Sequence, residues 1–227
     1  MADKKEPSFQ NKVENSVASF VKRNTKAIII TGVALLVILV GLWIGLSVSS
    51  SNRSSLQESI DTLGEQYTEW VSMEDLSSEE ATDALAVLKE DLTDLAGRTG
   101  SSYATVKANY LLGLIETRLE SYETALDYFL TAAEKGKDSY LSPLSLFNAA
   151  VTSEKLGDTL KALEYYQRVY DDTQGQAAES ARALFNVGRL YEESGDIELA
   201  EAILQQLADE YPNSEYAKLA QSRLVIL

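Results

Sequence analysis

The sequence predicts an all-α protein in which a single N-terminal transmembrane helix is followed by a solenoid of helical hairpins. Three observations predict this class. An uncharged run occupies residues 27–48, apolar residues recur with a helical period from residue 54 to the end, and short sequence blocks repeat at an offset of 37–38 residues. Only 3 of the 227 residues are Pro and 12 are Gly, and no alternating strand pattern is present, which fits a packed helical chain.

The uncharged run at 27–48 is the predicted membrane anchor. At roughly 1.5 Å per residue it is long enough to cross a hydrocarbon layer of about 30 Å. It exceeds the ~7–15 apolar residues of a signal peptide, so we expect it to be retained, and cleavage near residues 47–49 is the alternative. The tail at 1–26 carries six Lys/Arg and three Asp/Glu, which places it in the cytoplasm. In a bacterium this chain would be a single-pass inner-membrane protein with a periplasmic C-terminal body.

Two glycines in the anchor, Gly41 and Gly45, form a G-x-x-x-G pair. Such a pair lets two helix backbones approach closely, so it predicts self-association of the anchor into a homodimer. The alternative is that the pair arises by chance, because glycine is frequent in membrane helices.

Residues 49–100 are predicted to form a linker and two leading helices. The first helix has an apolar stripe that runs from Leu56 to Trp70 at helical spacing. For the second helix, Ser77 and Glu80 have the spacing of a capping box, and Gly97 lies where that helix should end.

An internal repeat organises the rest of the chain. The tripeptide at 146–148 (LFN) recurs at 184–186, and the Gly-Asp pair at 157–158 recurs at 195–196, both at an offset of 38. Gly and Asp suit a tight turn between two helices, and Ala125 marks an earlier copy 37 residues before Ala162. We therefore expect three helical hairpins at about 103–138, 141–175 and 177–212, with a capping helix at 214–227.

These hairpins resemble the tetratricopeptide repeat, a helix-turn-helix unit of 34 residues. The third copy matches the motif best, whereas in the first copy Glu116 stands at the usual Tyr position and Glu120 at the usual turn Gly. The matching residues of the third copy are Leu184, Gly188, Tyr191, Gly195, Ala200 and Pro212. The resemblance implies a stacked solenoid whose inner face is built by the first helix of each hairpin.

The resemblance also implies a partner-binding groove on this inner face. We expect its Phe side chains to anchor apolar groups, its Asn to bond a peptide backbone and its Arg to pair with carboxylates. The alternative is that Phe and Leu pack against the next hairpin or the capping helix and that Asn caps a turn. The candidate groove residues are Lys107, Tyr110, Leu111, Leu114, Arg118, Phe147, Asn148, Val151, Lys155, Arg182, Phe185, Asn186 and Arg189.

Composition argues against several functions. The chain has no Cys and no His, so thiol and imidazole catalysis and the usual zinc sites are excluded. No calcium-loop or phosphate-loop motif is present, and we expect no cofactor and no metal. The net charge of −15 disfavours nucleic acid as a partner. The sequence therefore predicts a protein-binding scaffold rather than an enzyme.

The order of basic tail, anchor and repeats resembles the ancillary subunit of the bacterial Sec translocon. The run at 20–24 (FVKRN), which leads into the apolar segment, contributes to this resemblance. It implies a scaffold that binds translocon subunits and periplasmic chaperones during envelope protein export. The segment at 211–217 (YPNSEYA) instead resembles adaptors of outer-membrane protein assembly or of cell-wall and division coordination. A third alternative is an enzyme or transport component whose solenoid only docks substrate.

Overall fold

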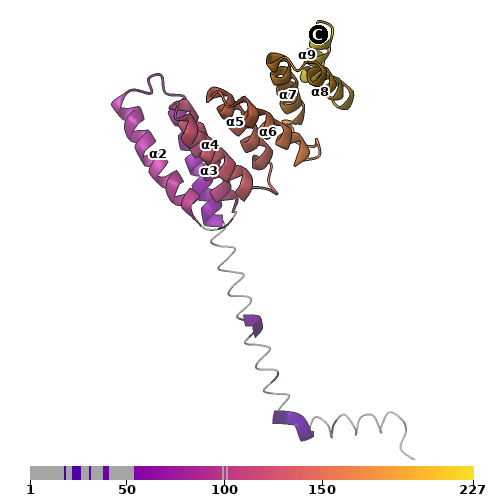
Figure 1. Cartoon of the computed structure of the whole chain (residues 1–227). Helices are drawn as coiled ribbons and strands as arrows, with labels where there is room; N and C mark the ends of the chain where they lie inside the picture. The colour runs from indigo at the N-terminus through magenta and orange to yellow at the C-terminus, as the bar shows by residue number, and fades with distance from the viewer. Residues whose placement is uncertain are drawn as a thin grey trace, which may run out of the picture. The chain divides into compact units, whose positions relative to one another are not determined.

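The computed structural model describes residues 18, 22–26, 31, 38–40, 54–98, 100 and 102–227. The chain divides into two compact units, Met1–Ser55 and Leu56–Leu227. All regular structure in the described ranges is α-helical, which confirms the predicted class for this part of the chain (Figure 1).

The predicted anchor lies almost wholly outside the described residues. Of the segment 27–48, the structure describes only residues 31 and 38–40, so Gly41 and Gly45 are not among the described residues. In the part of the chain that is described, no helix is both long and apolar enough to cross a membrane. The transmembrane helix therefore stays a prediction from sequence.

The second unit is a succession of helical hairpins (Figure 1). Helices that are consecutive in the chain pack against each other from α2 to α9, and α3 also contacts α5 while α7 contacts α9. The first pair is formed by helical residues 54–71 and α2 (Glu79–Gly97). The following helices are α3 (Tyr103–Arg118), α4 (Tyr122–Lys135), α5 (Leu141–Lys155), α6 (Thr159–Asp171), α7 (Ser180–Ser194), α8 (Ile197–Glu210) and α9 (Glu215–Leu224).

Serine and aspartate side chains define several helix starts. Ser78, Ser102 and Ser214 each accept a hydrogen bond from the backbone N–H three residues later, at 3.0–3.2 Å, and Asp158 does the same for α6 at 3.1 Å. These bonds satisfy backbone donors that a helix start leaves unpaired. The predicted cap at Ser77 is wrong by one residue, because Ser77 instead bonds the Asp75 carboxylate and α2 starts after Ser78.

The same turn joins the two helices of each hairpin in all three repeats. Glu120, Gly157 and Gly195 have φ values of 59°, 76° and 85°, in the left-handed region that favours glycine. In each turn the next backbone N–H donates to a carbonyl five residues back, at 2.9 Å, which is the bond of a Schellman motif. Glu120 thus adopts the glycine conformation, and the turn is retained in the first copy despite the missing glycine.

Two glycines allow the helices of a hairpin to cross closely. A Cβ added to Gly113 would lie 2.6 Å from the Phe129 ring, and a Cβ added to Gly188 would lie 2.8 Å from Leu204. Both distances are shorter than van der Waals contact, so larger residues at these positions would force the helices apart. The glycines are therefore required by packing.

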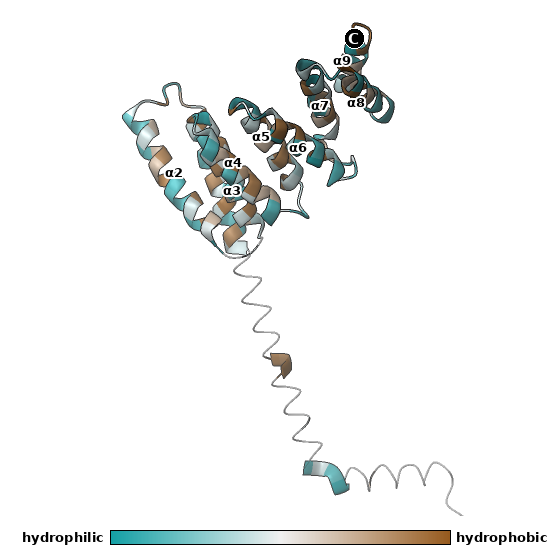
Figure 2. Cartoon of the chain, in the orientation of Figure 1, coloured by the Kyte–Doolittle hydropathy of each residue, from teal (hydrophilic) through white to brown (hydrophobic). Residues whose placement is uncertain are grey.

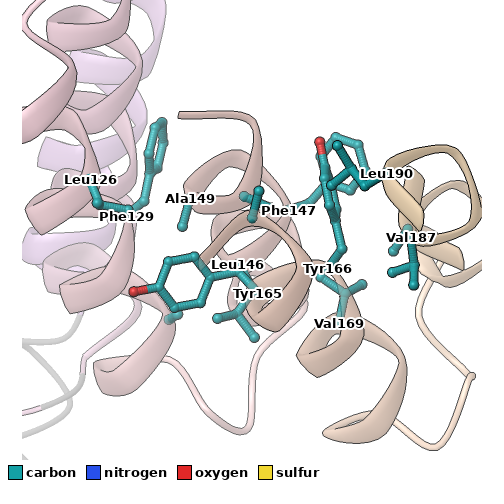
Figure 3. Close-up of a cluster of buried hydrophobic side chains, with 14 of the residues drawn as sticks. Leu126, Phe129, Leu146, Phe147, Ala149, Tyr165, Tyr166, Val169, Val187 and Leu190 are labelled. Atoms are coloured by element: carbon teal, nitrogen blue, oxygen red, sulfur yellow. The ribbon is translucent and has the colours of Figure 1, made fainter. Parts of the chain in front are cut away.

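Among the described residues, the hydrophobic core consists of three clusters along the row of hairpins, and the partly buried side chains of Leu114 and Ile203 each pack against two of them. Brown, hydrophobic stretches run along the helices where they face their neighbours, and teal, hydrophilic stretches cover the opposite sides (Figure 2). The central cluster draws side chains from α4, α5, α6 and α7, among them Phe129, Phe147, Tyr166 and Leu190, which are 1–3% exposed (Figure 3). Because each hairpin buries its faces against the next one, its stability depends on its neighbours.

Candidate interaction surface

The thirteen residues of the predicted groove lie on the first helix of each repeat: α3, α5 and α7. Leu111 and Phe147 are buried, at 6% and 3% exposure. Arg118, Lys155 and Arg182 are exposed, and the other eight are half-buried. We call this set the inner-helix surface. Its exposed members are all cations, so the apolar members contribute mainly to packing.

An aromatic residue occupies the same position in every repeat of the inner-helix surface. Tyr110 and Phe147 are 37 residues apart, and in both cases a side chain of the next inner helix contacts the aromatic residue. Asn148 Nδ2 donates a hydrogen bond of 3.3 Å to the Tyr110 hydroxyl, and the Arg182 guanidinium lies 4.3 Å from the centre of the Phe147 ring. A cation over an aromatic face is an attractive electrostatic contact.

The third aromatic of this column, Phe185, is covered by the capping helix α9. The Arg223 guanidinium lies 5.6 Å from its ring centre, and the Tyr216 ring lies 6.0 Å away. The Phe147 ring, besides its contact with Arg182, makes an edge-to-face contact with the Tyr166 ring, and the two ring centres are 5.2 Å apart. Phe147 and Phe185 thus join neighbouring helices, as the packing alternative expected, and only Phe185 keeps partial exposure.

Ion pairs form a second set of links between inner helices. Lys107 Nζ lies 2.9 Å from Asp61 Oδ1 on the leading helix. Arg189 Nη2 on α7 lies 2.7 Å from Glu154 Oε2 on α5, and its other nitrogen contacts Glu193 at 3.0 Å. Desolvation lowers the pKa of Arg189, but hydrogen bonds to the two carboxylates outweigh it and raise the pKa overall.

A corresponding ion pair links α7 to the capping helix. Arg223 donates to Glu192 Oε2, just as Arg189 donates to Glu154 one repeat earlier.

Glu154 also accepts a hydrogen bond of 2.8 Å from the Tyr166 hydroxyl. Burial and this bond to a carboxylate raise the pKa of Tyr166, so the phenol stays protonated.

Two tyrosine hydroxyls meet beside the Lys107 pair. Tyr103 and Tyr140, at the starts of α3 and α5, are 37 residues apart, and their hydroxyl oxygens are 3.0 Å apart. Burial, this hydrogen bond and the nearby Asp61 raise the pKa of Tyr103 to about 12.

Arg118 and Lys155 are the cations of the inner-helix surface that remain available. Each is the last residue of its helix, α3 and α5, and both are exposed. Within the described residues neither forms an ion pair, although cations at a helix C-terminus also interact favourably with the helix dipole. Val151, half-buried, lies one turn before Lys155 on α5. These side chains can contact carbonyls, carboxylates and small apolar groups of a partner.

Charge is distributed unequally between the two layers of helices. Within the three repeats, the first helices α3, α5 and α7 carry five Lys/Arg and four Asp/Glu, whereas the second helices α4, α6 and α8 carry three and nine. Within the three repeats, the acidic character therefore belongs mainly to the second helices of the hairpins. A polypeptide with carboxylates would be repelled by that layer and tolerated on the first.

Four residues of the ion-pair links were not predicted from sequence: Asp61, Glu154, Glu192 and Arg223. The repeat contains a signal for two of them, because Glu154 and Glu192 are 38 residues apart and pair with the next inner helix in the same way. Arg223 lies in the capping helix, which has no counterpart in the repeat, so no spacing points to it.

Comparison with known proteins identifies the repeats. Models of the tetratricopeptide repeat match residues 74–140 and residues 141–209. The chain is a tetratricopeptide-repeat protein. Such repeats are typically non-catalytic scaffolds for protein–protein interaction, and this is the function that the match supports. The first match begins before α2, so it includes part of the leading pair of helices.

Two relatives share more than a quarter of their aligned residues with this chain. A TPR repeat-containing protein of Treponema pallidum (strain Nichols) is 32% identical over 145 residues, which is 64% of this chain and 59% of that protein. The Photosystem I assembly protein Ycf3 of Cyanophora paradoxa is 31% identical over 104 residues, 44% of this chain and 60% of that protein. The chain thus spans about three fifths of the length of the relatives it matches.

A solved structure supports the fold independently. A kinesin light chain protein of Podospora anserina with nearly identical TPR-like repeats superposes with a TM-score of 0.55 at 11% identity. The superposition covers 76% of this chain and 84% of the other. At this identity the likeness concerns the fold alone.

Proposed function

We propose that this protein is a membrane-anchored, periplasm-facing scaffold that holds protein partners beside the Sec translocon and its periplasmic chaperones. The inner-helix surface binds the partner, and the scaffold catalyses no reaction. The observation that carries this proposal is the unequal charge of the two helices of each repeat, because α3, α5 and α7 combine exposed cations with fewer carboxylates than α4, α6 and α8.

The cellular setting of the proposal comes from the sequence. The uncharged run at 27–48 has the length of a membrane-spanning helix, and the basic tail before it has the charge of a cytoplasmic segment. The resemblance to the ancillary translocon subunit supplies the expected neighbours, and it is consistent with a tetratricopeptide-repeat body.

Arg118 and Lys155 provide the test of the binding surface. Cells would express the tagged full-length protein, and partners would be crosslinked, purified and quantified by mass spectrometry. The double variant Arg118→Glu, Lys155→Glu should lose translocon subunits and periplasmic chaperones by about tenfold, since exposed charges at an interface set encounter and specificity. The matched control Lys137→Glu, Lys218→Glu makes the same change of charge at exposed positions elsewhere and should retain them.

Two results would contradict the proposal. Equal loss of partners from both double variants would show that capture depends on the net charge of the protein and not on the inner-helix surface. Capture of neither translocon subunits nor chaperones by the unaltered protein would remove the proposed setting.

A role in assembling protein complexes is the second candidate. It is favoured by the likeness to the protein named as a Photosystem I assembly protein, and by the segment at 211–217 that resembles envelope-assembly adaptors. In this structure Tyr211 of that segment donates a hydrogen bond of 2.6 Å to the Gly175 carbonyl, and Ser214 caps α9. Enrichment of outer-membrane assembly or cell-wall proteins in the same crosslinking experiment would favour this candidate.

A further inference from the structure

A cleft between α6 and α7 shares no residue with the inner-helix surface. It encloses about 680 Å³ and is lined by the first half of α6, the second half of α7 and the turn that follows α7. Val187 and Leu190 form a buried floor, at 1% and 3% exposure, and Leu163 and Tyr191 are half-buried beside them. Figure 3 shows the floor residues Val187 and Leu190 on α7 facing the second repeat.

Leu160 lies at the edge of this cleft and is 80% exposed. The repeat shows that this is unusual, because the residue 37 positions earlier is Glu123 and the residue 38 positions later is Glu198, both exposed. The solvent-facing position is thus filled by a carboxylate in two repeats and by a leucine only where the cleft opens. An exposed apolar side chain beside an apolar cleft is typical of an interaction site.

The rim of the cleft is acidic. Glu164 on α6, Glu193 at the end of α7 and Asp196 in the following turn line it, and all three are exposed. The nearby cations are engaged elsewhere, since Lys161 pairs with Asp158 at 3.1 Å and Arg189 pairs with Glu193 and with α5. In the described part of the chain, neither Glu164 nor Asp196 forms an ion pair. The rim therefore has unneutralised negative charge.

We propose that this cleft is a second peptide-binding site, and that its partner is an amphipathic segment in which aliphatic side chains alternate with Lys or Arg. One aliphatic side chain packs on Leu160, Leu163 and the floor, and the flanking cations pair with Glu164 and Asp196. An acidic segment is excluded by repulsion from the rim, so this site and the inner-helix surface select partners of opposite charge. The scaffold can then hold two different segments at once.

The experiment uses the full-length protein in phosphatidylcholine nanodiscs and a 14-residue peptide of leucine and lysine that carries one photoreactive leucine. After irradiation, crosslinked residues are mapped by mass spectrometry, which separates binding to protein from binding to lipid. We expect crosslinks at 159–167 and 187–196. Leu160→Glu introduces the residue that the other two repeats have at this position. It should lower the yield of these crosslinks about tenfold, because burial of one leucine side chain increases affinity by about that factor.

Three controls make the outcome decisive. Leu199→Glu alters another exposed leucine, 49% exposed on α8 and outside the cleft, and should leave the yield unchanged. Glu164→Gln with Asp196→Asn should lower the yield about threefold, as expected for rim charges. A peptide of leucine and glutamate should not crosslink there.

The proposal is overturned if Leu160→Glu crosslinks as well as the unaltered protein, or if the crosslinks map to α3 and α5 instead. It is also overturned if the acidic peptide labels the cleft equally. The effect of Leu160→Glu does not bear on the inner-helix surface, because that surface is tested by variants at other residues; crosslinks of this basic peptide to α3 and α5 would count against the charge preference of that surface as well.

Discussion

Removal of the Arg189 charge is expected to lower the free energy of unfolding by about 1–2 kcal/mol. Arg189 Nη2 lies 2.7 Å from Glu154 Oε2, and Nη1 lies 3.0 and 3.1 Å from the two oxygens of Glu193. The Arg189 and Glu154 side chains are 20% and 27% exposed. Exposed pairs contribute about 0.2–1 kcal/mol, whereas breaking a buried pair costs about 3–5 kcal/mol, and this partly buried pair lies between those limits.

The assay is denaturant unfolding of the full-length protein followed by circular dichroism. Arg189→Met retains the apolar stem of the side chain, so the loss reports on the charge. A double-mutant cycle with Glu154→Gln isolates the pair, and its coupling energy should exceed about 0.5 kcal/mol. Arg168→Met is the matched control, because its contact with Asp172, the residue that follows α6, is a largely exposed pair at 3.5 Å and should contribute at most about 0.5 kcal/mol. A coupling energy near zero would refute the view that Arg189 links the second and third repeats.

Three further outcomes follow from local geometry. Gly188→Ala should lower the free energy of unfolding by about 1–3 kcal/mol, because the new Cβ meets the Leu204 side chain. A second substitution, Leu204→Val, should restore part of the lost stability. An unchanged free energy of unfolding in Gly188→Ala would contradict the close crossing of the two helices. Glu120→Gly should raise the free energy of unfolding by about 0.5–1 kcal/mol in the same assay, because φ is 59°, and a decrease would show that the side chain stabilises the turn. Stability should fall between pH 10 and 12, because the unfolded state releases the Tyr103 proton at the ordinary pKa of 10 while the folded state keeps it to about 12. Tyr103→Phe and Tyr140→Phe should each weaken that fall, and a Tyr103 tyrosinate absorbance that titrates near 10 would contradict the assignment.

The hairpins were predictable from sequence because their determinants are local. Apolar periodicity indicates a helix, and a repeated Gly-Asp pair indicates the turn between two helices. Glu120 shows why the prediction extends to the first copy, where glycine is absent. The Schellman bonds join backbone groups alone, so a residue that tolerates positive φ at some cost in strain can replace glycine.

The roles of individual surface residues were less predictable, because they depend on how one hairpin stacks on the next. Phe147 has the spacing of a groove residue, but whether its ring faces a partner or the core is decided by Arg182 and Tyr166 from neighbouring helices. Likewise Asn148 was expected to bond a peptide, and in this structure its amide donates to the Tyr110 hydroxyl. Spacing along one helix contains no information about the offset between helices, which is the quantity that selects these partners.

In a solenoid, residues that recur in every repeat are those that join one repeat to the next. The aromatic column recurs in all three repeats, and the glutamate of the Arg–Glu links recurs in the second and third as Glu154 and Glu192; both sets are occupied by internal contacts. Specificity for a partner must therefore reside in positions where the repeats differ. The position at the end of the first helix is such a position, since Arg118 and Lys155 end α3 and α5, and the equivalent residue of the third repeat, one before the end of α7, is Glu193.

That difference gives the inner-helix surface a direction. Arg118 and Lys155 are exposed and, among the described residues, form no ion pair, whereas Glu193 is already bound by Arg189. A segment that lies along this surface should therefore place its carboxylates over the first two repeats, because Arg118 and Lys155 are the exposed cations of this surface that, among the described residues, have neither an ion pair nor a ring contact. The cleft and the inner-helix surface then differ in the residues that form them, although α7 contributes to both, and in the sign of the charge they accept. Two such sites on one row of hairpins would allow the protein to bring together two partners that do not bind each other.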